Sequence, residues 1–214
     1  MVVEKNENIN VITLGPSGVG KTSIIKRIKD GTFEDTYKTT IALDHFFIKS
    51  KYEKKHIMIT LHFRDTNGLE SMQSLISIQY LRDSHIVLLI FSDLDTLDDI
   101  INRWYSFYQE NTNIDNSRFI LVGNKSDLFG NKRDEIINQG NQFAEEIDAL
   151  FLTCSAKSAD NMDNLERYIL TESKRFIDDE EKKKKNIDKK IKLDNKKNNK
   201  NNIDKNNNGN SKCC

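Results

Sequence analysis

The stretch VITLGPSGVGKTSII, residues 11–25, decides the fold of this 214-residue chain. Its first four residues form a short apolar run typical of a buried strand, and its last residues begin a segment, 21–30, with helical spacing of isoleucines. Residues 15–22 lie between the two and fit the pattern G-x-x-x-x-G-K-[ST]. A glycine-rich strand-to-helix turn occurs in many α/β proteins, but here the lysine and the hydroxyl are also present. Because glycines let backbone N–H groups turn toward an anion that the helix N-terminus also favours, the stretch predicts a phosphate-binding loop.

The other apolar runs of the chain are also short, continuous and bounded by turn residues. Such runs are typical of strands buried on both faces of a parallel sheet. The sequence predicts strands at 11–14, 43–52, 57–63, 86–91, 119–123 and 149–153, and helices at 21–30, 69–81, 96–110 and 161–177. The polar turn Glu53–Lys55 is expected to join 43–52 to 57–63 as an antiparallel hairpin. We therefore expect an α/β fold with a doubly wound, mostly parallel sheet of six strands, one antiparallel edge hairpin and helices on both faces.

Charge and composition divide the chain into a body and a tail. Residues 178–214 carry 12 Lys against 7 Asp plus Glu, with ten Asn, so the tail has a net charge of +5 in a chain that is neutral overall. A segment with so few apolar residues cannot bury enough surface to offset its ordering entropy. The sequence predicts one folded domain over 1–177 and a disordered Asn/Lys-rich tail over 178–214.

Several protein classes are not expected from the sequence. The first residues lack a basic segment followed by an apolar one, so no secretory signal is expected. The longest apolar run, 86–91, is far shorter than the roughly 20 residues of a membrane-spanning helix. The three cysteines, Cys154, Cys213 and Cys214, form neither a disulfide framework nor a metal-binding spacing, which fits a reducing compartment.

Two further motifs follow the last two strands. Asn124-Lys125-Ser126-Asp127 comes directly after 119–123, and Ser155-Ala156-Lys157 follows 149–153. An aspartate in such a loop can accept hydrogen bonds from N1–H and the 2-amino group of guanine, which adenine cannot offer, and an unpaired buried polar group discriminates strongly. Ligands of an open α/β sheet bind beyond the carboxyl ends of its strands, where these loops lie. The motifs together predict a guanine nucleotide as ligand.

With these motifs the sequence resembles the Ras superfamily of small GTPases over about residues 1–177, in the order GPSGVGKTS (15–23), DTNGLE (65–70), NKSD (124–127) and SAK (155–157). The resemblance implies binding of GTP or GDP with Mg²⁺, the ion being held by Thr22, Thr40 and, through water, Asp65. It implies nucleotide contacts from Gly15, Pro16, Ser17, Gly18, Val19, Gly20, Lys21, Thr22, Ser23, Phe33, Thr40, Asp65, Gly68, Asn124, Lys125, Asp127, Ser155, Ala156 and Lys157. Two loops are then expected to be ordered by the γ-phosphate and to relax after hydrolysis.

Within the superfamily the sequence is most similar to Rab proteins, through SGVGKTS (17–23), TIALD (40–44), YLRDSH (80–85) and the final Cys213-Cys214. This implies a monomeric switch in vesicle traffic whose partners are exchange factors, GTPase-activating proteins, a GDP-dissociation inhibitor or escort protein, and effectors. The effector region is expected at Tyr37, Lys38, Thr39, Thr40, Ile41, Ala42, Leu43, Asp44 and His45. In Rabs a tryptophan, a phenylalanine and a tyrosine, here Tyr80, usually form an aromatic patch that effectors contact. Arg64 stands in place of the tryptophan and His45 in place of the phenylalanine, so an unusual set of effectors is expected. Phe46 or Phe47 could replace that phenylalanine if the register shifts.

Leu69 departs from the family at the centre of the chemistry. The resemblance assigns hydrolysis to Lys21, Thr40, Gly68 and the residue after Gly68, which is usually a glutamine that orients the attacking water. Leucine has no donor or acceptor. The sequence thus predicts slow intrinsic hydrolysis, with a leucine that only packs in its loop as the alternative. The resemblance to Rabs implies that an activating protein can still supply both an arginine and a glutamine in trans.

Cys213 and Cys214 resemble the doubly geranylgeranylated Rab ending. Two prenyl chains anchor a protein stably where one is marginal, and the 12 Lys against 3 Asp from Lys182 onward suit an anionic leaflet. The alternative for the lysines is a solvated low-complexity tail. We therefore expect the chain on the cytoplasmic face of cellular membranes, with a cytosolic pool, and no nucleic-acid partner, since the basic tail lacks aromatic residues.

The sequence leaves three candidate functions to compare. The first is a Rab-like GTPase switch, and the second is a membrane-anchored scaffold that stays bound to GTP. The third, a P-loop kinase or ATPase, is disfavoured because NKSD and SAK follow the proper strands.

Overall fold

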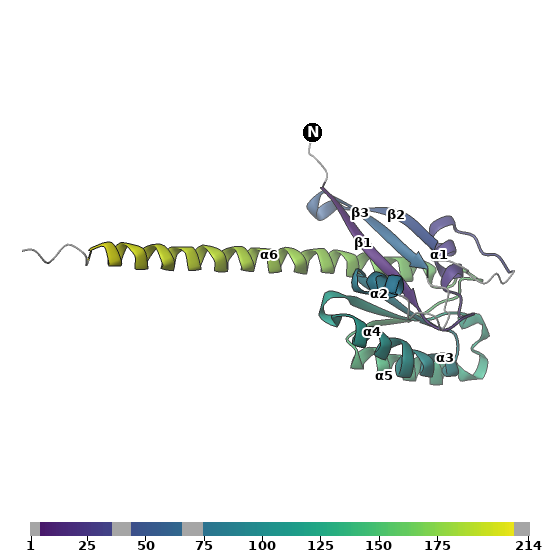
Figure 1. The fold of residues 1–214 in the computed structure, drawn as a ribbon. Helices are drawn as coiled ribbons and strands as arrows, with labels where there is room; N and C mark the ends of the chain where they lie inside the picture. The colour runs from purple at the N-terminus through teal and green to yellow at the C-terminus, as the bar shows by residue number, and fades with distance from the viewer. Residues whose placement is uncertain (1–4, 36–43, 66–74, 208–214) are drawn as a thin grey trace, which may run out of the picture. The chain divides into compact units, whose positions relative to one another are not determined.

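A six-stranded sheet forms the centre of the unit Met1–Phe176 in the computed structural model, which describes residues 5–35, 44–65 and 75–207 (Figure 1). The strands are β1 (Lys5–Leu14), β2 (Asp44–Tyr52), β3 (Ile57–Asp65), β4 (Ile86–Phe91), β5 (Arg118–Gly123) and β6 (Leu150–Thr153). Their order is β2-β3-β1-β4-β5-β6, with β2 and β3 antiparallel and the other pairs parallel. The predicted fold class is therefore confirmed, including the edge hairpin, whose turn is the 3₁₀ segment η1 (Glu53–Lys55).

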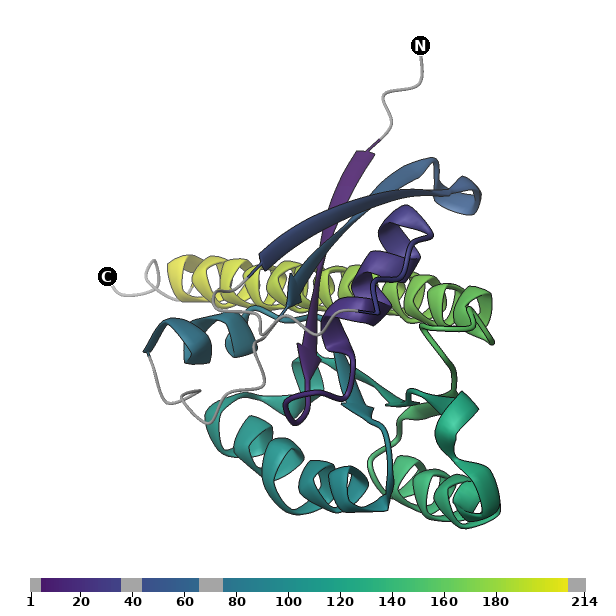
Figure 2. The same ribbon diagram turned by 90° about the vertical axis from the view of Figure 1, so that its right-hand side faces the viewer.

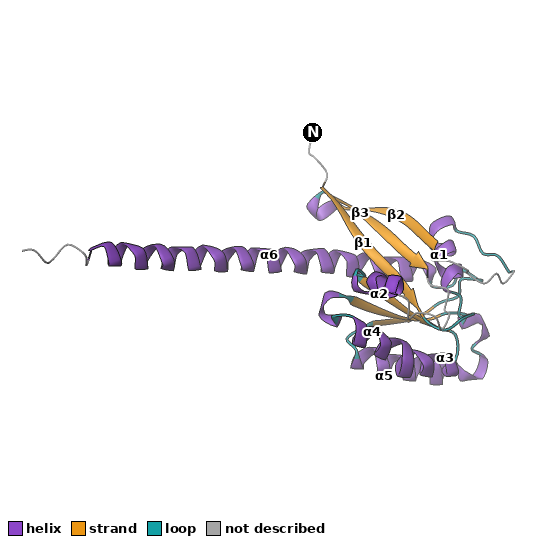
Figure 3. Ribbon diagram, in the orientation of Figure 1, coloured by secondary structure: helices purple, strands orange, loops and turns teal. Residues whose placement is uncertain are grey.

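Helices alternate with the strands (Figure 3). They are α1 (Lys21–Asp30), α2 (Leu75–Arg82), α3 (Leu94–Asp99), α4 (Tyr105–Asn111), α5 (Arg133–Glu146) and α6 (Met162–Asn207), with 3₁₀ turns η3 (Ile114–Asn116), η4 (Ser126–Leu128) and η5 (Gly130–Lys132). A π-helical turn, η2 (Ile100–Trp104), joins α3 to α4 where the sequence predicts one regular helix. In that turn the N–H of Tyr105 bonds to the carbonyl of Ile100, five residues back.

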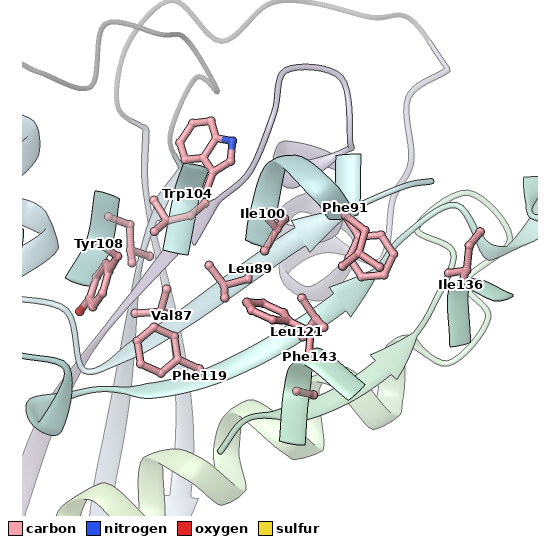
Figure 4. Packing of buried hydrophobic residues seen from close by; sticks show 14 of the residues in the cluster. Val87, Leu89, Phe91, Ile100, Trp104, Tyr108, Phe119, Leu121, Ile136 and Phe143 are labelled. Atoms are coloured by element: carbon pink, nitrogen blue, oxygen red, sulfur yellow. The ribbon is translucent and has the colours of Figure 1, made fainter. Parts of the chain in front are cut away.

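A cluster of buried apolar side chains lies on one face of the sheet, between β1, β4 and β5 and the helices α2 to α5 (Figure 4). Val87, Leu89 and Leu121 come from the strands and are fully buried. Phe119 of β5 meets the ring of Tyr105 at 5.4 Å and that of Tyr108 at 5.3 Å, both edge to face, an arrangement that aromatic rings prefer. This packing fixes α4 over the strand that leads into the NKSD loop.

The opposite face receives the alternate side chains of the same strands. There α1 packs on β2 and β3 (Figure 2). The ammonium of Lys174 in α6 lies 5.4 Å from the ring centre of Tyr52 in β2. The burial pattern of β3 alternates strictly, with Ile57, Ile59, Leu61 and Phe63 buried. Such alternation is typical of a strand with one face in the core and the other toward solvent.

Helix α5 is the element that the sequence patterns above do not predict. Its apolar stripe consists of Ile136, Phe143 and Ala144, interrupted by polar residues and by Gly140. A β-carbon at Gly140 would overlap the ring of Phe151 in β6, so the glycine allows the helix to lie close to that strand. The glycine at position 140 thus interrupts the apolar pattern by which a helix could be predicted, and it also allows α5 to pack closely on β6.

The chain divides into two compact units, Met1–Phe176 and Ile177–Cys214. In the first, α6 buries Leu165, Ile169 and Ser173. In the second, α6 continues to Asn207, which differs from the predicted disorder from Asp178 onward. Residues 178–207 contain no proline or glycine, and ion pairs one turn apart, Lys182 with Asp179 and Lys183 with Glu180, support the helix. No helix in the described part of the chain is long and apolar enough to cross a membrane.

Candidate nucleotide-binding site

The motifs GPSGVGKTS, NKSD and SAK, together with Asp65, lie at one edge of the sheet. Strands β1, β3, β5 and β6 run in the same direction, so their carboxyl ends share an edge. The segments that follow β1, β5 and β6 are 15–20, 124–127 and 154–161, while Asp65 ends β3. This is the edge at which open α/β sheets bind ligands.

The segment 15–20 depends on glycine at its two ends. Gly15 has φ +147° and Gly20 has φ +96°, values that other residues rarely adopt. A β-carbon at Gly15 would overlap the carbonyl oxygen of Ile90, and one at Gly20 would overlap the side-chain amide of Asn124. The loop therefore lies directly against β4 and the NKSD loop, and its backbone can approach a ligand closely.

Lys21 begins α1 and points back into this loop. Its Nζ donates hydrogen bonds to the carbonyl oxygens of Gly15 at 2.9 Å and Pro16 at 2.8 Å, and the side chain is 5% exposed. Burial lowers the pKa of Lys21 to about 8, an effect that the carboxylate of Asp65 opposes. The ammonium is thus held at the mouth of a loop of backbone amides, where it can bind phosphate oxygens.

Two oxygen donors suited to magnesium lie next to Lys21. The hydroxyl of Thr22 donates to Asp65 Oδ2 at 2.5 Å, and Thr13 Oγ1 lies 3.4 Å from Asp65 Oδ1. Asp65 is fully buried at the end of β3. Mg²⁺ prefers such hard oxygens and is usually held by one or two protein groups together with water and phosphate. The hydroxyl of Thr22 and the carboxylate of Asp65 therefore fit the ion. The described residues hold no cluster of three or more His, Cys, Asp or Glu side chains that could bind a metal by themselves.

Asn124 connects the three loops of the site. Its Nδ2 donates to the carbonyl of Val19 at 2.8 Å, and its Oδ1 accepts from the N–H of Ala156 at 3.1 Å. Its own backbone N–H bonds to the carbonyl of Phe91 at 2.8 Å. Asn124 is 1% exposed, so these bonds are made away from water. The side chain thus has a structural role in addition to the contact that the sequence predicts.

Asp127 is held by the SAK loop. Ser155 Oγ donates to Asp127 Oδ1 at 2.6 Å and accepts from the N–H of Ser158 at 3.1 Å. Lys125 adopts φ +60° before the turn η4, which places Asp127 beside Ser155. One oxygen of the Asp127 carboxylate is therefore fixed by the protein, which orients the group to accept hydrogen bonds from a base.

The remaining predicted residues are placed unevenly. Ser17, Gly18 and Ser23 lie in the loop and the first turn of α1, and Phe33 is half-buried after that helix. The backbones of Asp44 and His45 lie in β2, opposite Asp65 and Arg64. The other predicted residues lie outside the described ranges: Tyr37, Lys38, Thr39, Thr40, Ile41, Ala42, Leu43, Gly68, Leu69, Cys213 and Cys214.

Arg27 is a site-associated residue that the sequence reasoning missed. It lies on α1 and donates to the carbonyl oxygens of Ala156 at 2.8 Å and Lys157 at 3.1 Å. It belongs to none of the motifs, and a basic residue on a helix carries no signal of such a contact. Nearby, Lys157 also pairs with Asp35 at 3.3 Å, but both side chains are exposed, so that pair contributes little.

The fold and the phosphate loop define a P-loop protein whose second and third loops suit a guanine base. The Ras family model matches residues 10–175, which is most of the chain. The chain belongs to the Ras family. It is accordingly a small GTP-binding switch protein with GTPase activity, which binds GTP, GDP and Mg²⁺ and acts with exchange factors, activating proteins and effectors. Magnesium, when bound, neutralises phosphate charge, while Lys21 and the loop amides of this chain hold the phosphates.

Proposed function

We propose that the chain is a Rab-type switch that recruits effectors to intracellular membranes in vesicle traffic and hydrolyses GTP slowly by itself. The observation that carries the first part is the combination of SGVGKTS (17–23), YLRDSH (80–85) and the final Cys213-Cys214 with the Ras-family domain. The observation that carries the second part is Leu69, which stands where the family usually has glutamine.

The residues that replace the usual aromatic patch support an unusual set of effectors. The guanidinium of Arg64 lies 4.6 Å above the ring centre of Tyr80, and its Nη1 donates to the Tyr80 carbonyl at 3.1 Å. Further along the same face of the hairpin, Phe47 is 57% exposed and meets His62 edge to face at 4.8 Å. A cation stacked on tyrosine offers donors that a tryptophan would not. We infer that effectors of this chain present an acceptor, such as a carboxylate, opposite Arg64.

Leu69 supports slow hydrolysis on chemical grounds. An attacking water needs a partner that accepts or donates a hydrogen bond, and a leucine side chain has neither capacity. Bound GTP then persists until an activating protein provides the missing group. The switch of this chain accordingly depends on its activator for turning off.

The test is single-turnover hydrolysis of preloaded GTP with Mg²⁺, comparing the wild-type chain with Leu69→Gln. We expect faster hydrolysis in Leu69→Gln. A matched control is Ile187→Gln, which makes a similar change at a side chain that is 58% exposed in the second unit and should leave the rate unchanged. Equal rates in wild type and Leu69→Gln would show that another group positions the water and that the leucine only packs.

Membrane attachment forms the remaining part of the proposal. Cys213 and Cys214 would carry geranylgeranyl groups, and the lysines from Lys182 onward would face an anionic leaflet. The chain would then lie on the cytoplasmic face of membranes, with a cytosolic pool bound to a GDP-dissociation inhibitor or escort protein. A Cys213→Ser/Cys214→Ser variant should lose the membrane fraction in cells, whereas an unchanged membrane fraction would refute the lipid anchor.

A second candidate function is a membrane-anchored scaffold that stays bound to GTP. Leu69 favours this alternative too, and the two differ in their response to an activator. The scaffold is favoured if the wild-type chain keeps its GTP in the presence of Rab-directed activating proteins while the Leu69→Gln variant hydrolyses it.

A further inference from the structure

Arg27 joins α1 to the loop that follows β6. Its guanidinium donates from Nε to the carbonyl of Ala156 at 2.8 Å, from Nη2 to the carbonyl of Lys157 at 3.1 Å and from Nη1 to the carbonyl of Gly31 at 2.5 Å. One side chain thus binds two consecutive peptide units of the SAK loop and the residue that caps α1. The planar fork of an arginine suits such a set of acceptors, whereas a lysine has a single nitrogen.

The two peptide units that Arg27 binds, 156–157 and 157–158, orient different N–H groups of the SAK loop. Because a trans peptide is planar, the carbonyl of Ala156 fixes the N–H of Lys157 on its opposite side, turned away from Arg27. Within the described residues that N–H has no hydrogen-bond partner, so it is available to a ligand. In the same way the carbonyl of Lys157 fixes the N–H of Ser158.

The second peptide unit connects Arg27 to Asp127. The N–H of Ser158 donates to Ser155 Oγ at 3.1 Å, and Ser155 Oγ donates in turn to Asp127 Oδ1 at 2.6 Å. A donor on the Lys157 carbonyl polarises the amide and strengthens the next hydrogen bond in such a chain. A series of hydrogen bonds therefore runs from Arg27 on α1 through peptide 157–158 and Ser155 to Asp127, the carboxylate predicted to bind guanine.

We propose that Arg27 is a positioning residue for guanine recognition, acting through the SAK loop on Asp127 and on the N–H of Lys157. The inference rests on the proposed function, in which Asp127 and the SAK loop (155–157) bind the guanine base. The guanidinium of Arg27 donates to backbone carbonyl oxygens of this chain, those of Ala156, Lys157 and Gly31. It therefore controls how long the nucleotide stays and how well guanine is distinguished, and not the hydrolysis step.

The test compares Arg27→Ala with wild type by three measurements: GDP dissociation, the preference for GDP over IDP, and single-turnover GTP hydrolysis. Loss of the charged hydrogen bonds should speed GDP dissociation about 10–100-fold. IDP lacks the 2-amino group that Asp127 reads, so the GDP preference should fall about 2–10-fold. The hydrolysis rate of bound GTP should stay unchanged.

Arg82→Ala is the matched control, because Arg82 Nε also donates to a backbone carbonyl, that of Asn111 at 3.0 Å. Arg82 ends α2, shortly before β4 begins, and so lies near the sheet edge opposite the nucleotide loops. The Arg82→Ala variant should change none of the three measurements. If Arg27→Ala does not fold, Arg27→Lys serves instead, since it can keep one carbonyl contact and should give an intermediate dissociation rate.

Two results would overturn the proposal. One is GDP dissociation from the Arg27 variant at the wild-type rate. The other is faster dissociation with an unchanged preference for GDP over IDP, since that pattern belongs to a loosened scaffold. Failure of the base site itself is a separate result, because it would appear as a wild-type chain that does not prefer GDP to ADP.

Discussion

Replacement of Asn124 by alanine should disconnect the three loops of the site. The variant removes the donor to the Val19 carbonyl, made at 2.8 Å, and the acceptor for the Ala156 N–H, made at 3.1 Å. Val19 is fully buried and Ala156 is 2% exposed, so neither backbone group can turn to water without movement of its loop. Asn124→Ala therefore leaves two buried polar groups without their partners.

The expected loss of stability follows from these two groups. Each buried polar group left unsatisfied costs about 1–3 kcal/mol, so unfolding should become easier by about 2–6 kcal/mol. For a domain of this size each kcal/mol shifts the melting temperature by about 2–4 °C, which predicts a decrease of at least about 4 °C. Dissociation of GDP should also be faster, because the phosphate loop and the SAK loop lose their shared contact.

Thermal and urea unfolding of the GDP-loaded chain measure the first effect, and displacement of a fluorescent GDP analogue measures the second. Asn102→Ala is the control, because Asn102 Nδ2 donates only to the Asp98 carbonyl one turn back on an exposed helix face. Its stability should stay within about 0.5 kcal/mol of wild type. An Asn124→Ala chain as stable as Asn102→Ala would refute the structural role assigned to Asn124.

Three further predictions concern other parts of the first unit. Tyr108→Phe should lower the free energy of unfolding by about 1–3 kcal/mol in urea titrations, because the buried hydroxyl contacts Ser84 Oγ at 2.9 Å and Ser117 Oγ at 2.7 Å; an unchanged midpoint would contradict this. Burial raises the pKa of Asp93, but hydrogen bonds from Thr96 and Ser92 outweigh burial and lower it overall. Asp93→Ala should thus cost about 1 kcal/mol near neutral pH. A carboxylate whose pKa is lower in the folded than in the unfolded chain stabilises the folded state above the unfolded pKa, and this stabilisation is lost as the pH falls through the folded pKa. The difference in unfolding free energy between wild type and Asp93→Ala should therefore shrink below about pH 4. A difference that stays constant with pH would refute the role of the Asp93 charge. Burial, then Asp160, raises the pKa of Cys154 to about 12, so in Cys213→Ser/Cys214→Ser a thiol reagent should react slowly until the chain is denatured, whereas rapid reaction of the folded chain would contradict the burial.

The parts of the fold that the sequence predicts are those in which local pattern and final environment agree. Strand β4 reads as a continuous apolar run and is buried on both faces, as a central parallel strand should be. The loops after β1 and β5 could be located because ligands of such sheets bind at one edge. The pairing of β2 with β3 followed from the polar turn Glu53–Lys55 and is confirmed.

The parts that the sequence did not predict depend on tertiary contacts. Strand β1 begins at Lys5, six residues before the apolar run, because pairing with β3 stabilises its polar half. The π-helical turn η2 and the close approach of Gly140 to Phe151 depend on how helices fit the sheet, which no local pattern states. The Arg27 contacts join segments about 130 residues apart in the chain. Such long-range hydrogen bonds have no periodic signature.

Nucleotide competition tests the account most directly. The chain is loaded with a fluorescent GDP analogue in the presence of Mg²⁺, and its release is followed after addition of excess GDP, GTP, IDP, ADP or ATP. The arrangement of Lys21, Asn124 and Asp127 predicts displacement by GDP and GTP, weaker displacement by IDP and none by ADP or ATP. Equal displacement by ADP and GDP would contradict the assignment of Asp127 and the SAK loop to guanine recognition.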